Sequence, residues 1–140
     1  MAAIKVFIDK ELDVAEFRVE GILTYQELRD AIARYYSGTL TKYTVWDFTN
    51  ADVKNFRNNE LMQIGNQVNL AGKAREKCFD VIIVPGLIHY GLARVYAGYS
   101  EAIQKKSDAL KTMVFRSREH AFNWIRENSR MAKKAAEIQY

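Results

Sequence analysis

The sequence predicts an α/β fold, with a mixed β-sheet of about five strands and four main helices in the order β-β-α-β-α-β-α-β-α. Apolar and polar residues alternate with a period of two along residues 4–20, which is typical of a hairpin. Short apolar or β-branched runs then alternate with helical patterns along the rest of the chain. That alternation favours parallel strands joined by right-handed helical crossovers, and the hairpin makes the sheet mixed.

The hairpin and the first helix have clear boundary residues. Gly21 ends the second strand, which carries one polar face. Thr24 and Glu27 stand three residues apart in the pattern of a capping box, so they predict the start of a helix. Gly38 is typical of the C-terminal end of that helix.

The middle of the chain predicts two strands around a second helix. Residues 43–48 (YTVWDF) are rich in β-branched and aromatic residues, as strands are. A polar connection follows at 49–59, and a helix is expected from about Asn59 to Ala71. Residues 78–84 (CFDVIIV) are almost continuously apolar before a Pro-Gly break, which predicts a strand covered on both faces.

The C-terminal third predicts a helix over roughly residues 87–105, a strand at 111–115 and a final helix capped by Ser117. Gly91 and Gly98 lie two turns apart on one face of the first of these helices, which favours close helix packing there. The inward stripe of the same helix is expected to comprise Ile88, Leu92, Val95, Tyr99 and Ile103.

Length and composition predict one domain at residues 1–128, followed at 129–140 by a basic C-terminal tail or helix extension. No apolar run approaches the roughly 20 residues of a membrane-spanning helix. The N-terminus lacks the pattern of a signal peptide, and Cys78 is the single cysteine. We therefore expect a cytoplasmic protein without an internal disulfide.

Charge is unevenly distributed along the chain, whose net charge is +4. Residues 1–101 hold 12 Lys and Arg against 13 Asp and Glu, whereas residues 102–140 hold 9 against 4. The basic runs are short and are not interleaved with aromatic residues, as they are in many nucleic-acid surfaces. We expect a solvated basic face and no nucleic-acid partner.

Common enzyme motifs are missing from the sequence. It contains no phosphate-binding G-x-x-x-x-G-K-[ST], no G-x-G-x-x-G after a strand and no G-x-S-x-G. Cys78 precedes an apolar strand and is expected to be buried and inert. His89 and His120 do not have the spacing of metal ligands. The sequence assigns no catalytic residue, no metal and no cofactor.

The first candidate site lies where the fourth predicted strand meets the third helix. His89 and Tyr90 follow the C-terminal end of that strand, where open α/β sheets bind ligands. The helix start offers free N–H groups, and Arg94 lies one turn after Tyr90. These residues predict a pocket for a small anion. The alternative is that His89 and Tyr90 only pack at the helix entrance.

The second candidate site is the polar stretch at the end of the third strand. Functional residues are often found on such turns. The alternative is that Asn and Asp act here only as turn formers and helix caps. The candidate partner- or ligand-binding residues of this stretch are Asp47, Thr49, Asn50, Asp52 and Asn55.

The sequence resembles the SpoIIAA-like branch of the STAS family, the sulfate transporter and anti-sigma factor antagonist domains, over roughly residues 4–127. The order and spacing of four segments carry the resemblance. They are GILTYQEL (21–28), VWDFTNAD (45–52), VIIVPGLIHYGLARVYAGY (81–99) and VFRSREHAFNWI (114–125).

The resemblance implies a small bacterial α/β domain that binds rather than catalyses, with a fold similar to lipid-binding Sec14-type domains. Signalling STAS domains dock on a partner kinase or transporter, and phosphorylation of a Ser or Thr after the third strand switches that docking. The matching position falls near Asn55 and Phe56, and residues 52–59 contain no Ser or Thr. No phosphosite is therefore assigned.

Two binding hypotheses follow. The first is a non-catalytic regulatory module that docks on an unknown protein through residues 49–62 and 85–94. The second is a domain that binds a small anionic or lipid-like ligand in a pocket at residues 84–94.

Two further hypotheses remain open. An enzyme would use His89 with Asp47 or Tyr90 as acid–base groups. A homodimer would be built on the segment after Asn128.

Overall fold

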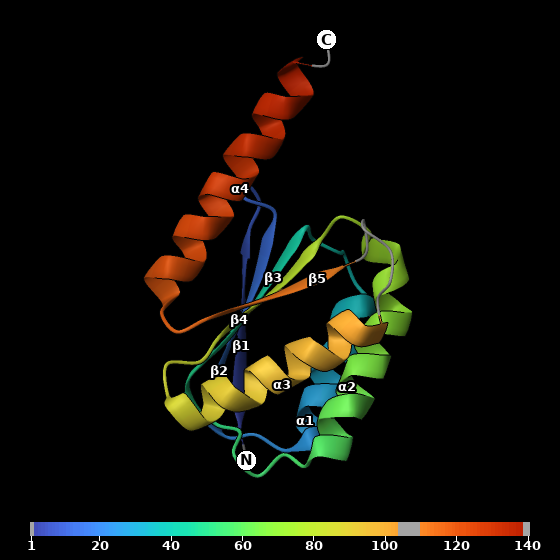
Figure 1. Ribbon diagram of the computed structural model, residues 1–140, viewed down its shortest axis with the longest axis vertical. Coiled ribbons are helices and arrows are strands. Elements are labelled where there is room, and N and C mark those ends of the chain that lie inside the picture. The colour runs from blue at the N-terminus through green and yellow to red at the C-terminus, as the bar shows by residue number, and fades with distance from the viewer. Residues whose placement is uncertain (1, 104–109, 139–140) are drawn as a thin grey trace.

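The computed structural model of this chain describes residues 2–103 and 110–138. It contains a five-stranded sheet with helices on both faces (Figure 1). The strands are β1 (Ala3–Asp9), β2 (Val14–Ile22), β3 (Tyr43–Asp52), β4 (Phe79–Ile83) and β5 (Lys111–Phe115). The helices are α1 (Tyr25–Tyr36), α2 (Asn58–Ala71), α3 (Leu87–Ile103) and α4 (Arg118–Ile138), with the short 3₁₀ helix η1 (Gly72–Arg75) after α2. The predicted α/β class and the predicted order of strands and helices are confirmed.

The strands follow one another across the sheet in the order of the sequence. β1 and β2 form the antiparallel hairpin, and the remaining neighbours pair in parallel. Because side chains alternate between the two faces, the register partners Phe17, Trp46 and Ile82 share one face. Their neighbours Val45 and Val81 point to the other face.

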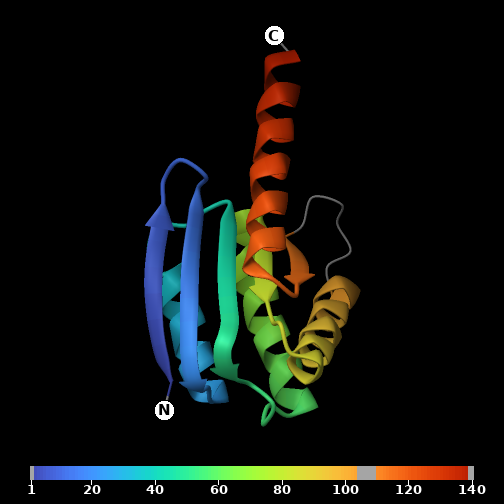
Figure 2. The same ribbon diagram turned by 90° about the vertical axis from the view of Figure 1, so that its left-hand side faces the viewer.

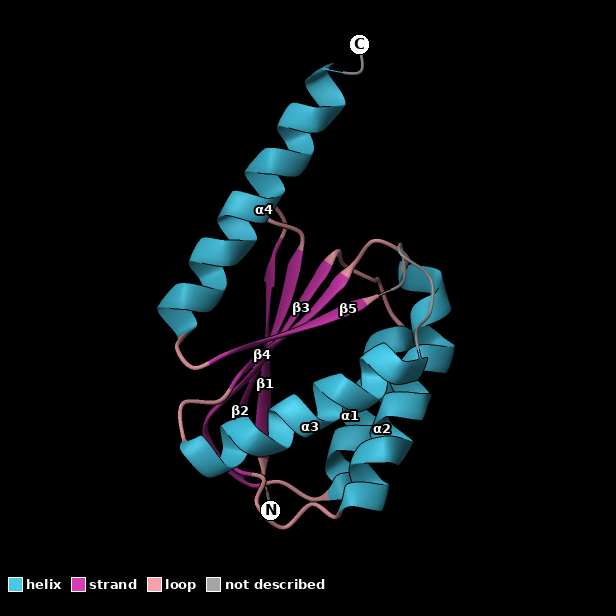
Figure 3. Ribbon diagram, in the orientation of Figure 1, coloured by secondary structure: helices cyan, strands magenta, loops and turns pink. Residues whose placement is uncertain are grey.

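Each face of the sheet has its own core. Helices α1, α2 and α3 cover one face, and α4 covers part of the other (Figures 2 and 3). The core under α1–α3 is the larger and includes Phe17 and Ile64. The core under α4 is built on Tyr43, Ala121 and Ile125. Beyond that core the C-terminal end of α4 extends past the sheet (Figure 2).

The predicted capping box at the start of α1 is confirmed. The Thr24 side chain accepts a hydrogen bond from the Glu27 N–H at 3.1 Å, and Glu27 Oε1 accepts one from the Thr24 N–H at 3.0 Å. The second Glu27 oxygen accepts from the Ala2 N–H at 2.9 Å. One side chain thus satisfies free donors of the helix and also holds the residue that precedes β1.

The third strand is longer than the sequence predicts, because it continues through Asp52 rather than ending at residue 48. A register shift between Arg18 and Glu20 brings the end of β2 beside these extra residues. Ala51 is buried there, opposite Gly21. The pairing with β2 therefore extends a stretch whose polar composition alone indicates a loop.

The buried face of α3 differs from the predicted stripe. Val95 is 42% exposed, and the buried side chains are Ala93, Tyr96 and Ala97. Apolar residues surround this part of the helix, so the pattern does not define a single face. The side chains of Ile88, Tyr99 and Ile103, and residues 104–105, lie outside the described part of the chain.

The expectation of close packing at Gly91 and Gly98 is wrong. Both glycines are exposed, and a Cβ atom at either would meet no described atom within 4 Å. They lie on the outer side of α3, away from its buried face.

The described helices also bear on membrane insertion. None of those in residues 2–103 and 110–138 is both long enough and apolar enough to cross a membrane.

Candidate functional site

An apolar cavity of about 90 Å³ lies between the sheet and helices α1–α3. On the sheet side it is lined by Trp46 of β3 and Ile82 of β4. On the helix side it is lined by Leu61 and Ile64 of α2 and by Ala93 of α3. Native interiors contain few voids larger than a water molecule, so a space of this size is a candidate binding site.

Stacked aromatic rings hold the sheet side of the cavity in place. The Phe17 and Trp46 rings stack with centroids 4.1 Å apart and an interplanar angle of 8°. Phe48 continues the stack 6.4 Å from Trp46, and Tyr35 meets Phe17 edge-on at 5.7 Å. Rigid rings packed against one another do not collapse into a neighbouring space, so they maintain the wall.

One end of the cavity is polar because it contains a buried ion pair. Arg75 of η1 is only 1% exposed, and its Nη1 donates to Asp80 Oδ1 at 2.8 Å. The Thr44 hydroxyl donates to the same oxygen. Arg75 also donates to the Thr41 carbonyl at 3.0 Å and to the Tyr36 hydroxyl at 3.2 Å. These bonds satisfy a charge that would otherwise be costly to bury.

Charge and burial act in opposite directions on Arg75. Burial acts to lower the pKa of the guanidinium, but the negative charge of Asp80, together with the interactions with Tyr35 and Tyr36, outweighs burial. The net result is a raised pKa, so Arg75 stays charged. Asp80 and Arg75 together leave this end of the cavity with no net charge.

Two phenols line the cavity, and one of them, Tyr36, lies at the polar end beside Arg75. Burial, assisted by the charge of Asp80, raises the pKa of Tyr36 to about 12. Burial also raises the pKa of Tyr96 well above its ordinary value, and Asp80 and Tyr36 act in the same direction. Both phenols line the cavity and remain protonated at neutral pH.

Sequence reasoning missed Arg75 and Asp80. Arg75 stands in the polar run GKAREK, which is typical of a surface turn. The available signal was Asp80, an acid inside an otherwise apolar strand, because a carboxylate in a buried strand needs a positive or hydrogen-bonding partner. Which residue supplies that partner depends on the tertiary fold.

His89 lies at another part of the cavity lining. Its side chain is half-buried, and its Nε2 is 3.6 Å from Asp52 Oδ1. Asp52 Oδ1 also accepts a hydrogen bond from the Lys54 N–H at 3.1 Å. That hydrogen bond lowers the pKa of Asp52, with desolvation opposing it and the charges of Lys54 and His89 assisting. The two candidate turns predicted from the sequence therefore meet at His89 and Asp52.

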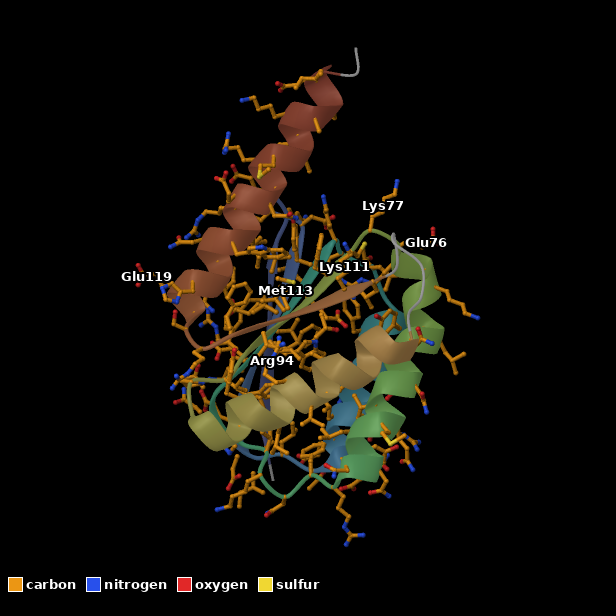
Figure 4. All side chains as sticks on the ribbon, viewed as in Figure 1. Glu76, Lys77, Arg94, Lys111, Met113 and Glu119 are labelled. Carbon is orange, nitrogen blue, oxygen red and sulfur yellow. The ribbon has the colours of Figure 1, made fainter. Side chains whose placement is uncertain are left out.

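The other residues of the first candidate site lie apart from the cavity lining. Tyr90 is half-buried, with the Arg116 guanidinium 5.8 Å from its ring centre. Arg94 is exposed on α3 (Figure 4). The structure thus brings His89, but neither of these two residues, to the cavity.

The second candidate site is divided between the two faces of the sheet. Asp47 points to the α4 face, where it accepts hydrogen bonds from the Thr49 N–H at 2.9 Å and from the Thr49 hydroxyl. Arg118 lies 3.8 Å from the other Asp47 oxygen. Asn50 and Asn55 are exposed. Of this group, only Asp52 approaches His89.

The described part of the chain was also considered for metal ligands and for a reactive thiol. No group of three or more His, Cys, Asp or Glu side chains there could hold a metal ion. The Cys78 thiol lies 3.5 Å from the Glu76 carbonyl oxygen, and burial raises its pKa. Since the thiolate is the reactive form, this environment disfavours a nucleophilic role.

The comparisons with known proteins support the fold. No family model and no curated protein matches the sequence. One similar solved structure is an uncharacterized protein of the DUF3478 family from Shewanella loihica PV-4, with a SpoIIAA-like fold. The match covers 89% of this chain and 93% of that one, at a TM-score of 0.55 and 17% identity. The predicted resemblance is confirmed at the level of architecture, and the chain has a SpoIIAA-like fold.

Proposed function

We propose that this protein is a non-catalytic binding module that takes a small apolar or amphipathic molecule into the cavity between the sheet and α1–α3. The observation that carries this proposal is the apolar space of about 90 Å³. An engineered apolar cavity of about 150 Å³ binds benzene. A ligand that fills this space would remove apolar surface of the lining from water.

A variant that fills the cavity tests the proposal. Ala93→Leu adds three carbon atoms to the lining, whereas Val95→Leu adds one to an exposed position on the same helix. We expect toluene to raise the Tm of the wild type and of Val95→Leu, and to leave Ala93→Leu unchanged. Native mass spectrometry of gently purified protein would then show whether a natural ligand is retained. Failure of toluene and of xenon to bind the wild type would contradict the proposal.

We also propose that residues 49–62 and 85–94 form a docking surface for a partner protein, as in a regulatory module. The observation that favours this second function is the contact between His89 and Asp52, which joins the two segments. Since His89 also lines the cavity, a bound ligand would change the position of the side chain that links them. Docking would then respond to the ligand.

Amide chemical shifts test this coupling directly. Toluene should shift the amide signals of Asp52 and Lys54 in the wild type, and these shifts should disappear in His89→Ala while toluene still binds. Shifts confined to the cavity lining would show that ligand and surface are independent. The docking proposal would then lose its structural basis.

A further inference from the structure

The outer strand β1 has an open edge lined by apolar side chains. Within residues 2–103 and 110–138, the only strand that pairs with β1 is β2, so the other edge of β1 faces solvent (Figure 2). Three consecutive apolar side chains are exposed there, Val6 at 55%, Phe7 at 42% and Ile8 at 59%. Natural proteins usually shorten, charge or cover such an edge. This strand therefore has the character of an interface.

The α1 side of the same edge is also open. A groove of about 520 Å³ lies there, with Val6 and Ile8 on the strand side and Arg34 on the side of α1. In the register with β2, Val6 lies opposite Phe17, which belongs to the larger core. A strand added beside β1 would thus continue the apolar face of the sheet and cover Val6 and Ile8.

The opposite face of β1 carries two charges that have no counter-charge in the chain. Lys5 lies opposite Arg18 of β2, and Asp9 lies opposite Val14. Neither Lys5 nor Asp9 forms an ion pair with any residue that the structure describes. The two lie four residues apart, which is roughly 13 Å along a strand and beyond ion-pair distance. Only a neighbouring strand on the open edge would pair both charges.

A second copy of β1 supplies the missing charges. Edge-to-edge pairing of two identical strands about a two-fold axis is antiparallel, and the axis can pass through Phe7. In that register Lys5 lies opposite Asp9 of the second copy, and Asp9 lies opposite its Lys5. Val6 lies opposite Ile8, and Phe7 lies opposite its own copy. If the axis moves by one residue in either direction, Lys5 no longer meets Asp9.

We propose that two copies of this protein associate through β1 in this register, so that the two sheets join into one continuous sheet. The inference is independent of ligand binding in the cavity, and it places a homodimer contact on β1 rather than on the segment after Asn128. Main-chain hydrogen bonds between the two strands would provide affinity. The pairs between Lys5 and Asp9 would favour a second copy over other extended segments.

Charge reversal tests both the surface and the register. Lys5→Glu places two carboxylates opposite each other, and Asp9→Lys places two ammonium groups opposite each other. Sedimentation velocity of the full chain at concentrations up to millimolar gives the dissociation constant of the dimer. We expect each variant alone to weaken the dimer about tenfold. An equimolar mixture of the two variants should associate as tightly as the wild type, because each supplies the charge that the other lacks.

A matched variant and a salt series serve as controls. Lys111→Glu makes the same charge change on the opposite edge strand β5 and should leave the dimer unchanged (Figure 4). Asp9 also accepts a hydrogen bond from the Leu12 N–H at 3.0 Å, so Asp9→Lys can disturb the hairpin turn. In that case salt should still weaken the wild-type dimer and strengthen that of Lys5→Glu, because it screens attraction in the first and repulsion in the second.

Each other outcome overturns the proposal or a stated part of it. A wild type that remains monomeric at millimolar concentration would show that β1 does not self-associate. If Lys5→Glu and Lys111→Glu affect a dimer equally, the dimer uses another surface. If the two β1 variants fold and their mixture does not recover the association, or if salt acts in the same direction on the wild type and on Lys5→Glu, the register is wrong.

Discussion

The hydrophobic cores on the two faces of the sheet are packed differently. Under α4, the rings of Tyr43 and Phe79 stack with centroids 5.5 Å apart, and Trp124 meets both edge-on. Ala121 and Ile125 are fully buried against this cluster. Under α1–α3, a larger core leaves a space of about 90 Å³. The side chains under the single helix α4 pack closely, whereas the three helices on the other face leave this space unfilled.

The faces also differ in how they bury charge. On the α4 face, Glu16 is buried, but its partners Arg18 and Arg118 are 44% and 45% exposed at their side chains. On the α1–α3 face, both members of the Arg75–Asp80 pair are buried. The arginines that pair with Glu16 remain partly in contact with water. The Arg75–Asp80 pair is removed from water, so internal hydrogen bonds must replace its hydration. The energetic consequences of removing one arginine should therefore be unequal.

Removing Arg75 should give the largest effect. Arg75→Leu leaves Asp80 buried without its counter-charge, and we expect the free energy of unfolding to fall by about 3–5 kcal/mol. Arg118→Leu should cost no more than about 1 kcal/mol, because Glu16 keeps the hydrogen bonds from Arg18. Urea unfolding followed by tryptophan fluorescence measures both variants.

A double variant separates the unpaired charge from lost packing. Arg75→Leu with Asp80→Asn removes both charges, and it should recover much of the stability lost in the single variant. Equal losses for Arg75→Leu and Arg118→Leu would show that the two faces do not differ in this respect.

Adding the same atoms to each face should give the next largest difference. Ala121→Leu inserts three carbons into a fully buried position and should destabilise the protein by about 1–3 kcal/mol. Ala93→Leu inserts them beside the cavity and should change stability by less than about 1 kcal/mol in either direction. Thermal and urea unfolding of the pair provide the measurement. An equal loss in both would mean that the space closes in solution.

The loss of stability at alkaline pH should also differ between tyrosines on the two faces of the sheet. In the folded state the pKa of Tyr36 is raised to about 12 and that of Tyr96 is raised well above its ordinary value, in both cases first by burial. The unfolded chain ionises its tyrosines near pH 10. The contribution of these two phenols to the free energy of unfolding is therefore fully present below pH 10, and it is lost as the pH rises towards 12.

Substitution of single tyrosines by phenylalanine shows which phenols cause the loss of stability at alkaline pH. Tyr36→Phe and Tyr96→Phe should each flatten the fall in urea midpoint between pH 9 and pH 11. On the other face, burial raises the pKa of Tyr43, but the hydrogen bond from Asn128 opposes that shift. Tyr43→Phe should flatten the curve less. An identical slope in all three variants would contradict the comparison.

The fold was largely predictable because its signals are local. Alternation identifies the hairpin, Thr24 and Glu27 identify the start of α1, and the apolar run before Pro85 identifies a central strand. The end of β3 was not predictable in this way, since its pairing depends on a register shift in β2.

The candidate site was predictable only in part. The topology rule for parallel sheets brings His89 near the end of β3, where Asp52 lies. The cavity and the buried position of Arg75 arise from how three helices pack, and no spacing in the sequence encodes that packing. Tyr96 and Val95 illustrate the limit, because two adjacent apolar residues of α3 differ in burial through tertiary contacts alone.

The contact between His89 and Asp52 should give the smallest effect, because both side chains are partly exposed. Asp52→Asn should change Tm by no more than about 2 °C at pH 7. The lowered pKa of Asp52 means that its stabilising contribution is present above about pH 4 and is lost as pH falls further. Glu119→Gln removes an exposed charge on α4 and serves as the control (Figure 4). If Asp52→Asn lowers Tm as much as Arg75→Leu does, the edge of the cavity would be as important to the fold as its buried ion pair, and the division of roles between the interior and the rim would not hold.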